Sequence, residues 1–302
     1  MISNIEIQKF IDSLNIELPP KEDFLQLSNA CPINPIKPEN NSNLERGILL
    51  YGLISKYKPK NVLEIGRAEG FSTLCMAWSM SDNDIDGTIH TIDPKPFDTS
   101  IERINTWNKN EKQETVKLST KELWNKVAKK EWINKINVFT GLSGEILKKT
   151  SKELPQMDMG FIDGHHTYNA VRHDFYAFLQ IASKNFHLLF DDYDTDGQVG
   201  VSKAINEDVS PYFDMTLINN PEESDKHTVM CLINSDSLNE PLDEIYPKAK
   251  SDQIIIEYLN WEKRWKLRKS LNKKVPGSGI LLTLSTLPYT ELFGGSEKQN
   301  KI

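Results

Sequence analysis

Short apolar runs alternate with amphipathic, helix-length stretches through the central part of the chain. Five of these runs predict buried strands, at 61–65, 88–92, 136–140, 157–162 and 186–190. Helices are expected at 43–58, 72–80, 168–183 and 202–209, and two further strands at 215–218 and 228–233. Strands that alternate with helices are typical of an α/β fold, because the crossover helices cover both faces of a parallel sheet. The expected fold is a doubly wound, mostly parallel, seven-stranded sheet.

Two flanking segments depart from this alternation, so we divide the chain into three parts. Residues 1–42 predict an N-terminal helical cap and linker, in which prolines end short amphipathic helices. Residues 43–234 are the α/β core, and residues 235–302 are a C-terminal helical extension and tail. Within this extension, 254–271 predicts a helix whose aromatic stripe favours docking against the core. One connection within the core, 97–135, is long enough to hold two helices.

The composition is that of an acidic globular protein. The 302 residues include 43 acidic and 36 basic ones, which gives a formal net charge of −7. A nucleic-acid partner would favour a basic face, so this charge argues against one. The three cysteines match neither a disulfide framework nor a metal motif. We expect a cytoplasmic protein, because the chain shows neither the apolar region of a signal peptide nor a stretch apolar enough to span a bilayer.

Carboxylates follow two neighbouring apolar runs. Asp163 comes directly after the run 157–162, and Asp191 and Asp192 follow the run 186–190. Neighbouring strands lie about 4.8 Å apart, and open α/β sheets bind their ligands at the carboxyl ends of the strands. Up to three negative charges would crowd one small site, and they could not all stay ionised without a counter-charge. A divalent cation is the simplest counter-charge, and carboxylate ligands suit Mg²⁺ or Mn²⁺ better than zinc.

A glycine turn after the first strand indicates a cofactor with an adenosine. Glu64 lies near the end of this strand, Gly66 and Gly70 follow it, and Asp93 ends the second strand. An acid at the position of Asp93 can accept both hydrogens of a ribose diol, and Glu64 could receive an ammonium group. A dinucleotide-binding turn would carry a glycine where Ala68 stands. An amino-acid group beside an adenosine describes S-adenosylmethionine (SAM) better than NAD.

These features form an ordered set of motifs. The set is ExGxxxGxS from Glu64 to Ser72, the acid Asp93, DGxHxY from Asp163 to Tyr168, and DD at Asp191 and Asp192. It resembles the class I SAM-dependent methyltransferases, and among them the metal-dependent O-methyltransferases of the catechol-type, macrolide-sugar and cephalosporin-hydroxylase-like group. The resemblance covers about Glu45 to Ile233 and implies a Rossmann-like methyltransferase fold. The turn 67–69 is more charged than the family's glycine-richer pattern, and a long insert follows Asp93.

The resemblance implies a role for each motif residue. The cofactor-binding residues would be Glu64, Gly66 and Gly70 at the methionine end, Asp93 at the ribose, Gly141, Leu142 and Ser143 beside the adenine, and also Ser72 and Asp163. The metal ligands would be Asp163, Asp191 and Asp192, and the choice between the last two as direct ligand stays open. His166 would be the general base, because neutral imidazole titrates near working pH. Adjacent side chains in extended chain point to opposite sides, so His165 is the alternative.

The predicted function is a SAM-dependent methyl transfer, assisted by Mg²⁺ or Mn²⁺, to a hydroxyl of a small molecule such as a sugar, a glycoside or another natural-product intermediate. One alternative is a non-catalytic module that binds SAM or a nucleotide. Another is an NAD-dependent oxidoreductase, which Ala68 and the absence of a hydride-site signature disfavour. We expect neither nucleic-acid nor membrane partners, and the terminal helices could support a homo-oligomer.

Overall fold

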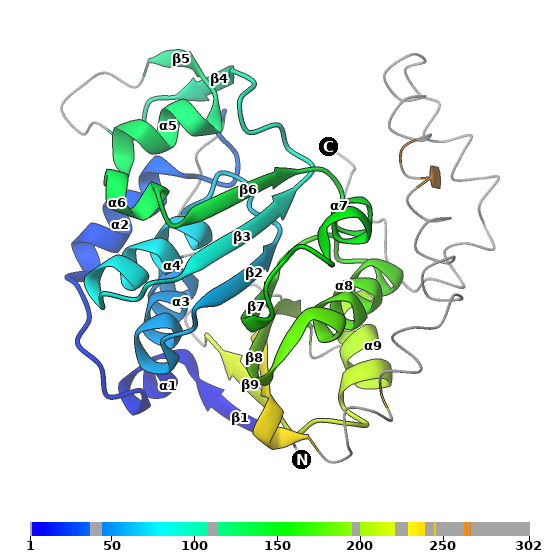
Figure 1. Ribbon diagram of the computed structural model, residues 1–302. Helices are drawn as coiled ribbons and strands as arrows, with labels where there is room; N and C mark the ends of the chain where they lie inside the picture. Colours follow the sequence, from blue (N-terminus) through cyan, green and yellow to red (C-terminus); the bar gives the residue numbers. More distant parts are fainter. Residues whose placement is uncertain are drawn as a thin grey trace.

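An eight-stranded sheet forms the centre of the computed structural model (Figure 1). The structure describes residues 2–36, 44–107, 114–194, 200–220 and 229–238, together with residues 245, 263, 264 and 266. The strands stand in the order β1-β9-β10-β8-β7-β2-β3-β6. Their bounds are β1 Ile2–Glu6, β2 Asn61–Ile65, β3 Thr88–Asp93, β6 Ile136–Thr140, β7 Met157–Ile162, β8 Ala182–Tyr193, β9 Met215–Asn219 and β10 Val229–Asn234. Strands β8, β7, β2, β3 and β6 run parallel, whereas β10 is antiparallel to both of its neighbours.

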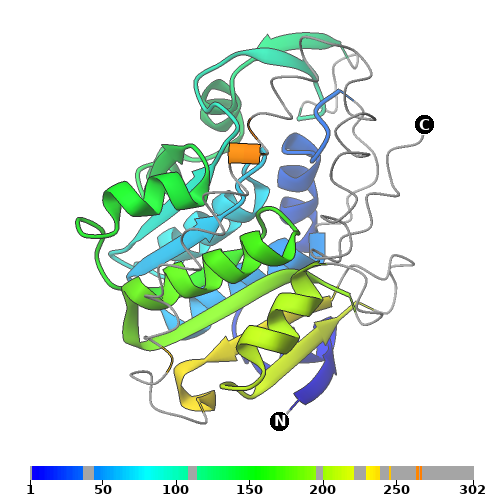
Figure 2. The same cartoon turned by 90° about the vertical axis from the view of Figure 1, so that its right-hand side faces the viewer.

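Helices cover both faces of this sheet (Figures 1 and 2). The first face carries α1 Ile7–Ser13, α2 Lys21–Ala30, α3 Leu44–Tyr57, α4 Phe71–Asp82, α5 Thr120–Val127 and α6 Lys130–Ile133. The second carries α7 Ser143–Thr150, α8 Tyr168–Ile181 and α9 Gly200–Ala204, which a π-helical turn, Ile205–Val209, continues. Strand residues alternate between the two layers, so Val62 of β2 packs under the first face and Leu63 under the second.

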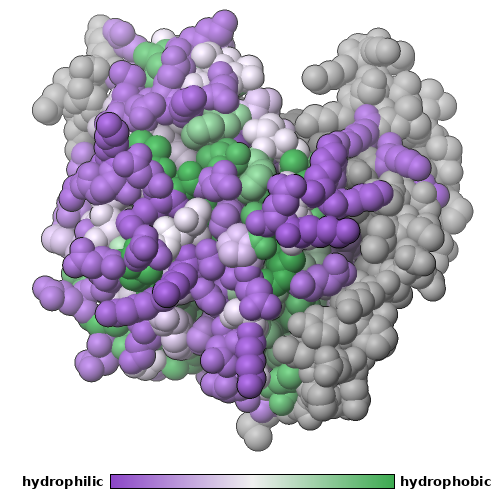
Figure 3. All heavy atoms as spheres, viewed as in Figure 1, coloured by the Kyte–Doolittle hydropathy of each residue, from purple (hydrophilic) through white to green (hydrophobic). Residues whose placement is uncertain are grey.

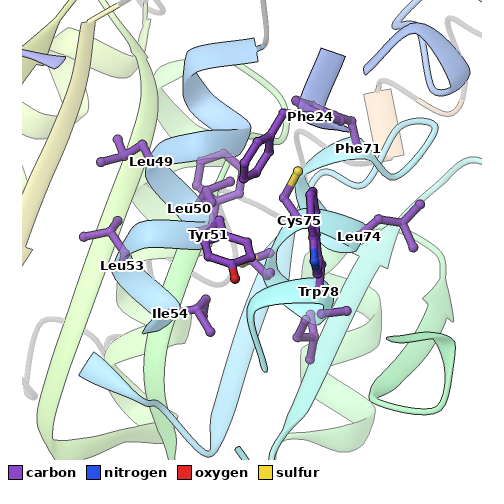
Figure 4. Packing of buried hydrophobic residues seen from close by; sticks show 14 of the residues in the cluster. Phe24, Leu49, Leu50, Tyr51, Leu53, Ile54, Phe71, Leu74, Cys75 and Trp78 are labelled. Atoms are coloured by element: carbon purple, nitrogen blue, oxygen red, sulfur yellow. The ribbon is translucent and has the colours of Figure 1, made fainter. Parts of the chain in front are cut away.

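Three aromatic side chains hold the helices of the first face together (Figure 4). Phe24 of α2 lies edge-on to Tyr51 of α3, and Trp78 of α4 packs against both rings, with centroid distances between 4.7 and 5.5 Å. The Tyr51 hydroxyl also donates a hydrogen bond of 2.9 Å to Asp82 at the end of α4. Such aromatic contacts are worth about 0.5–1.5 kcal/mol each beyond the area they bury. They fix α3 on the sheet, and with it the side chain of Arg46 in its first turn.

The surface agrees with the acidic, polar composition. Hydrophilic side chains cover most of the described surface in Figure 3, with small hydrophobic areas between them. None of the helices within the described ranges is long and apolar enough to cross a membrane.

The α/β alternation predicted from the apolar runs is confirmed, because all five predicted core strands are present at the expected places. The structure corrects the strand count. Residues 2–6 form an eighth strand, β1, where only helices were expected. This strand lies at the edge of the sheet and exposes most of its residues, so its sequence lacks the apolar run that marks a buried strand.

The connection 97–135 holds the two expected helices, and it also contains two strands that were not expected. It contains a two-stranded hairpin, β4 Ile101–Ile104 and β5 Thr115–Leu118, before α5 and α6. Charged residues interrupt both strands of the hairpin, so they too lack an apolar run. Strand β8 extends to Tyr193, because β10 pairs with it as far as that residue. The predicted helix at 254–271 lies outside the described residues, apart from positions 263, 264 and 266.

Candidate active site

Three aspartates meet at the carboxyl ends of β7 and β8. Ile162 of β7 pairs with Phe190 of β8 in parallel register, so Asp163 and Asp191 follow side by side. Asp191 is buried, with 6% of its surface exposed. Asp192 has a φ of +57°, a left-handed conformation that is uncommon outside glycine and most tolerable for Asp and Asn. The regular course of the strand is interrupted there, and the Asp192 carboxylate reaches the loop after β7.

His166 lies in that loop, between two of the carboxylates. Its Nε2 is 2.9 Å from Asp192 Oδ2 and 3.8 Å from Asp163 Oδ1. Burial lowers the pKa of His166, but the hydrogen bonds and charges of Asp163 and Asp192 outweigh this effect and raise the pKa to about 10. Burial, and then the neighbouring His166, lower the pKa of His165 to about 4. The two adjacent imidazoles therefore differ in protonation, and His166 is the one in contact with the carboxylates.

The arrangement fits a divalent ion at one part of the cluster. Asp163, His166 and Asp192 each offer a ligand atom, and these atoms lie within 4.8 Å of one another. Oxygen ligands from two carboxylates suit a hard cation such as Mg²⁺ or Mn²⁺. Asp191 is outside this group. Direct coordination by any of these residues stays a prediction.

Arg46, from the first turn of α3, supplies a cation at the other part of the cluster. Its Nη1 donates a hydrogen bond of 2.5 Å to Asp163 Oδ2 and forms a second ion pair with Asp191 Oδ2. Burial raises the pKa of Asp191, Arg46 opposes that rise, and the charges of Asp163 and Asp192 add to it. Sequence reasoning missed Arg46. The signal that could have found it was the unbalanced charge of three aspartates. A positive side chain of the protein can balance this charge as well as a metal ion can.

Glu64 of β2, the first residue of the motif predicted to bind the cofactor, is fully buried. Its Oε2 accepts hydrogen bonds of 2.5 Å from the hydroxyls of Thr73 and Thr91, and its Oε1 has no hydrogen-bond partner among the residues that the structure describes. Burial raises the pKa of Glu64 to about 7, although both threonines and Arg67 oppose the rise. A buried acceptor without a hydrogen-bond partner destabilises the folded protein. A ligand that donates to Oε1, for example through an ammonium group, would remove this penalty.

The glycine turn between β2 and α4 packs against the carboxylate cluster. Gly66 has a φ of +99°, and a Cβ on it would lie 1.8 Å from the carbonyl oxygen of Asp163. Gly70 has a φ of +96°, and a Cβ there would overlap the ring of Trp124. Both positions require glycine, because the chain's own atoms fill the place of a side chain. The turn and Asp163 therefore share one edge of the sheet.

Asp93 joins this turn to the end of β3. Its Oδ2 accepts a hydrogen bond of 2.8 Å from the amide of Ala68, and its Oδ1 accepts one of 2.6 Å from the amide of Lys95. A carboxylate offers about four lone-pair positions, so these two bonds leave capacity for a ribose diol. The backbone carbonyl oxygen of Asp93 also accepts a hydrogen bond from the amide of Gly141. This bond brings the turn after β6 to the same edge of the sheet.

The other predicted cofactor residues lie around this turn. Leu142 and Ser143 are buried at the start of α7, and the Ser143 hydroxyl donates a hydrogen bond of 2.6 Å to Asp174 of α8. Ser72 is buried in the first turn of α4. The structure thus gathers all the predicted cofactor residues at the ends of β2, β3, β6 and β7, and their contact with a cofactor stays a prediction.

The hairpin insert clamps the charged part of the glycine turn. Glu69 is buried and forms ion pairs with Arg103 of β4 and with Lys95. Its carbonyl oxygen also accepts a hydrogen bond of 2.9 Å from the Trp124 indole of α5. The charged turn, which departs from the family's glycine-rich pattern, has its partners in the insert after Asp93, which is the other departure. The two departures are therefore linked, because the charged turn forms its ion pairs and its hydrogen bond with residues that follow Asp93.

Comparisons with known proteins agree with this picture. Residues 63–193, from β2 to β8, match a family model described as a methyltransferase domain. No curated protein sequence is similar enough to count as a relative. The chain is similar in structure to the O-methyltransferase TomG from Streptomyces achromogenes, involved in tomaymycin synthesis and solved with SAM. The identity is 15%, the match covers 74% of this chain and 93% of that one, and the TM-score is 0.50.

Two further solved structures are similar. One is an O-methyltransferase from Bacillus cereus in complex with SAH, at 16% identity, 74% coverage of this chain, 95% of that chain and a TM-score of 0.49. The other is a putative O-methyltransferase from Klebsiella pneumoniae, at 17% identity, 77% and 96% coverage and a TM-score of 0.49. Residues 63–193 are thus similar to a methyltransferase domain, and the fold of the chain is like that of TomG.

Proposed function

We propose that this chain is a SAM-dependent methyltransferase that transfers the methyl group of SAM to a hydroxyl oxygen of a small molecule; the match to a methyltransferase domain and the likeness in fold to TomG support this. The observation that carries the proposal is the contact between the glycine turn and Asp163, which brings the cofactor motif and the carboxylate–histidine cluster together. A methyl donor held by the turn would lie close to groups that can orient and deprotonate an alcohol. A sugar, a glycoside or another natural-product intermediate is the expected acceptor.

Three features support SAM as the donor. Oε1 of Glu64, to which none of the described residues donates, suits the ammonium of the methionine end. The remaining lone pairs of Asp93 suit the ribose hydroxyls. The buried residues that begin α7, Leu142 and Ser143, suit the border of the adenine. The sulfonium of SAM supplies an activated methyl carbon, so the protein has mainly to align donor and acceptor, which can lower a barrier by up to about 7–11 kcal/mol.

The reaction is an in-line displacement. The acceptor oxygen forms a bond to the methyl carbon while the carbon–sulfur bond breaks, and S-adenosylhomocysteine leaves with the electron pair of that bond. The hydroxyl proton passes to a base. In our proposal this base is Nε2 of His166 in its neutral form. Asp163 and Asp192 hold the ring in place, and a cation on these carboxylates would offset the charges that raise the pKa of His166. Asp163 and Asp192 would also hold a divalent ion, which would orient the acceptor's oxygens and lower the pKa of its hydroxyl.

Cofactor binding is tested with an aspartate pair. Asp93→Ala should weaken SAM binding about ten- to a hundredfold in isothermal titration, because the ribose hydroxyls lose a charged acceptor. Asp158→Ala is the matched control: its carboxylate also accepts from two backbone amides, those of Lys60 and Asn61, but at the opposite end of the sheet. Equal SAM affinity in the two variants would contradict the cofactor assignment.

Methyl transfer is then measured with labelled SAM and a panel of hydroxyl compounds, in Mg²⁺ and in EDTA. We expect turnover in Mg²⁺, loss of turnover in EDTA, and recovery when Mg²⁺ or Mn²⁺ is added back. Full activity in the chelator would remove the metal from the proposal and leave acceptor activation to His166. SAM binding without transfer to any hydroxyl of the panel would favour the non-catalytic alternative.

A further inference from the structure

Arg46 divides the carboxylate cluster into two parts. Asp163 lies at the boundary, because its Oδ2 accepts from Arg46 while its Oδ1 faces His166. Asp191 contacts Arg46, whereas Asp192 contacts His166. The three ligand atoms that lie close enough together for one ion belong to Asp163, His166 and Asp192. Asp191, which contacts Arg46, is not part of this group.

Arg46 is firmly placed for this role. Its side chain is 16% exposed, and the two carboxylates it contacts are 20% and 6% exposed. It extends from the first turn of α3, the helix that the Phe24–Tyr51–Trp78 contacts fix on the sheet. Partly desolvated, charge-assisted bonds are among the stronger hydrogen bonds of a protein. Arg46 therefore neutralises part of the negative charge that would otherwise attract a divalent ion.

We propose that Arg46 is a resident counter-cation that withholds Asp191 from the metal and lowers the affinity of the site for a divalent ion. This inference rests on the metal-assisted part of the proposed function. It changes the expected ligand set from three aspartates to Asp163 and Asp192, with His166 adjacent. It also makes metal occupancy depend on a residue of α3, which lies before the methyltransferase domain in the sequence.

Mn²⁺ binding to the full chain tests the inference without SAM or acceptor, by electron paramagnetic resonance of the free ion or by calorimetry. Arg46→Gln should bind Mn²⁺ about ten- to a hundredfold more tightly, the ratio that corresponds to about 1.5–3 kcal/mol for a hydrogen bond to a charged group. Arg46→Lys keeps the charge and should stay near the wild-type affinity. Arg172→Gln removes an arginine paired with Asp208, outside the cluster, and should leave the affinity unchanged.

A second pair of variants tests the ligand set even if Arg46→Gln folds poorly. Asp192→Asn should abolish Mn²⁺ binding, whereas Asp191→Asn should not weaken it by more than about threefold. Unchanged or weaker Mn²⁺ binding in a folded Arg46→Gln protein would overturn the inference, and so would loss of binding in Asp191→Asn. Because none of these readouts involves methyl transfer, failure of the inference is distinguishable from failure of the proposed function.

Discussion

Replacement of Glu64 by Gln should change how the stability of the protein depends on pH. The carboxylate is fully buried. Two threonine hydroxyls donate to Oε2, whereas no described residue donates to Oε1. Glutamine has nearly the same shape, its amide oxygen can accept from Thr73 and Thr91, and it carries no charge. The variant therefore removes the free energy of burying a charge and little else.

The direction and the magnitude of this change in stability follow from the pKa of Glu64. Burial raises the pKa of Glu64 from 4.5 to about 7, so between these pH values the folded protein holds a proton that the unfolded chain has released. Stability then falls as the pH rises through this window and levels off above it. The difference between the two pKa values corresponds to about 3 kcal/mol of unfolding free energy. The unfolding free energy of Glu64→Gln minus that of the wild type should therefore be up to this amount larger at pH 8 than at pH 4.5.

The assay is urea unfolding of both proteins between pH 4.5 and 8.5, with the free energy of unfolding extrapolated to water. Differences between variant and wild type at each pH cancel the titration of the other groups. Glu102→Gln is the control for loss of a carboxylate at an exposed position, since Glu102 is exposed on the hairpin. The pH-dependent gain of Glu64→Gln should clearly exceed any change seen in this variant. The outcome that would refute the reasoning is a Glu64→Gln difference that stays constant over the whole range.

Two further predictions concern the turn and the loop after β7. His166→Ala should lower kcat about 10²–10⁴-fold, as for other acid–base residues, with SAM affinity nearly unchanged; if His165→Ala is the impaired variant instead, the base is His165. Gly66→Ala should lower the free energy of unfolding in urea by more than about 2 kcal/mol, because its φ of +99° disfavours a side chain and the new Cβ would meet Asp163. Gly164→Ala, whose Cβ would come no closer than 3.1 Å to the Ile65 side chain, should lose clearly less, and equal losses would contradict this account.

The central sheet was predictable because its strands are buried on both faces. Runs such as 61–65 and 157–162 are apolar at consecutive positions, and helices on both faces require this. Strand β1 and the hairpin β4–β5 carry no such run. The hairpin packs on the glycine turn through a buried ion pair between Arg103 and Glu69. Charged residues look the same in a sequence whether they are buried or exposed, so this contact could not be predicted.

The candidate site was predictable as far as strand ends determine it. Asp163, Asp191 and Asp192 follow from the order of apolar runs, and the structure places them together. Which carboxylate contacts Arg46 and which contacts His166 was not predictable, because this depends on Arg46, which lies outside the strands, and on the backbone conformation of Asp192 within β8. Arg46 lies 117 residues before Asp163 in the sequence, and no pattern in one sequence links them. The left-handed conformation of Asp192 is likewise a property of the folded chain.

The pairing of β1 with β9 has a consequence for the order in which the molecule is assembled. Residues 2–6 leave the ribosome long before their partners, residues 215–219, so this edge of the sheet cannot close until β9 has been synthesised. In the meantime α1 can already dock on α3 through Leu14, whose side chain lies against Gly52. Contacts between residues so distant in sequence slow folding. A nascent chain stalled before residue 215 would therefore present an unpaired strand, whereas a completed chain covers it with its own β9.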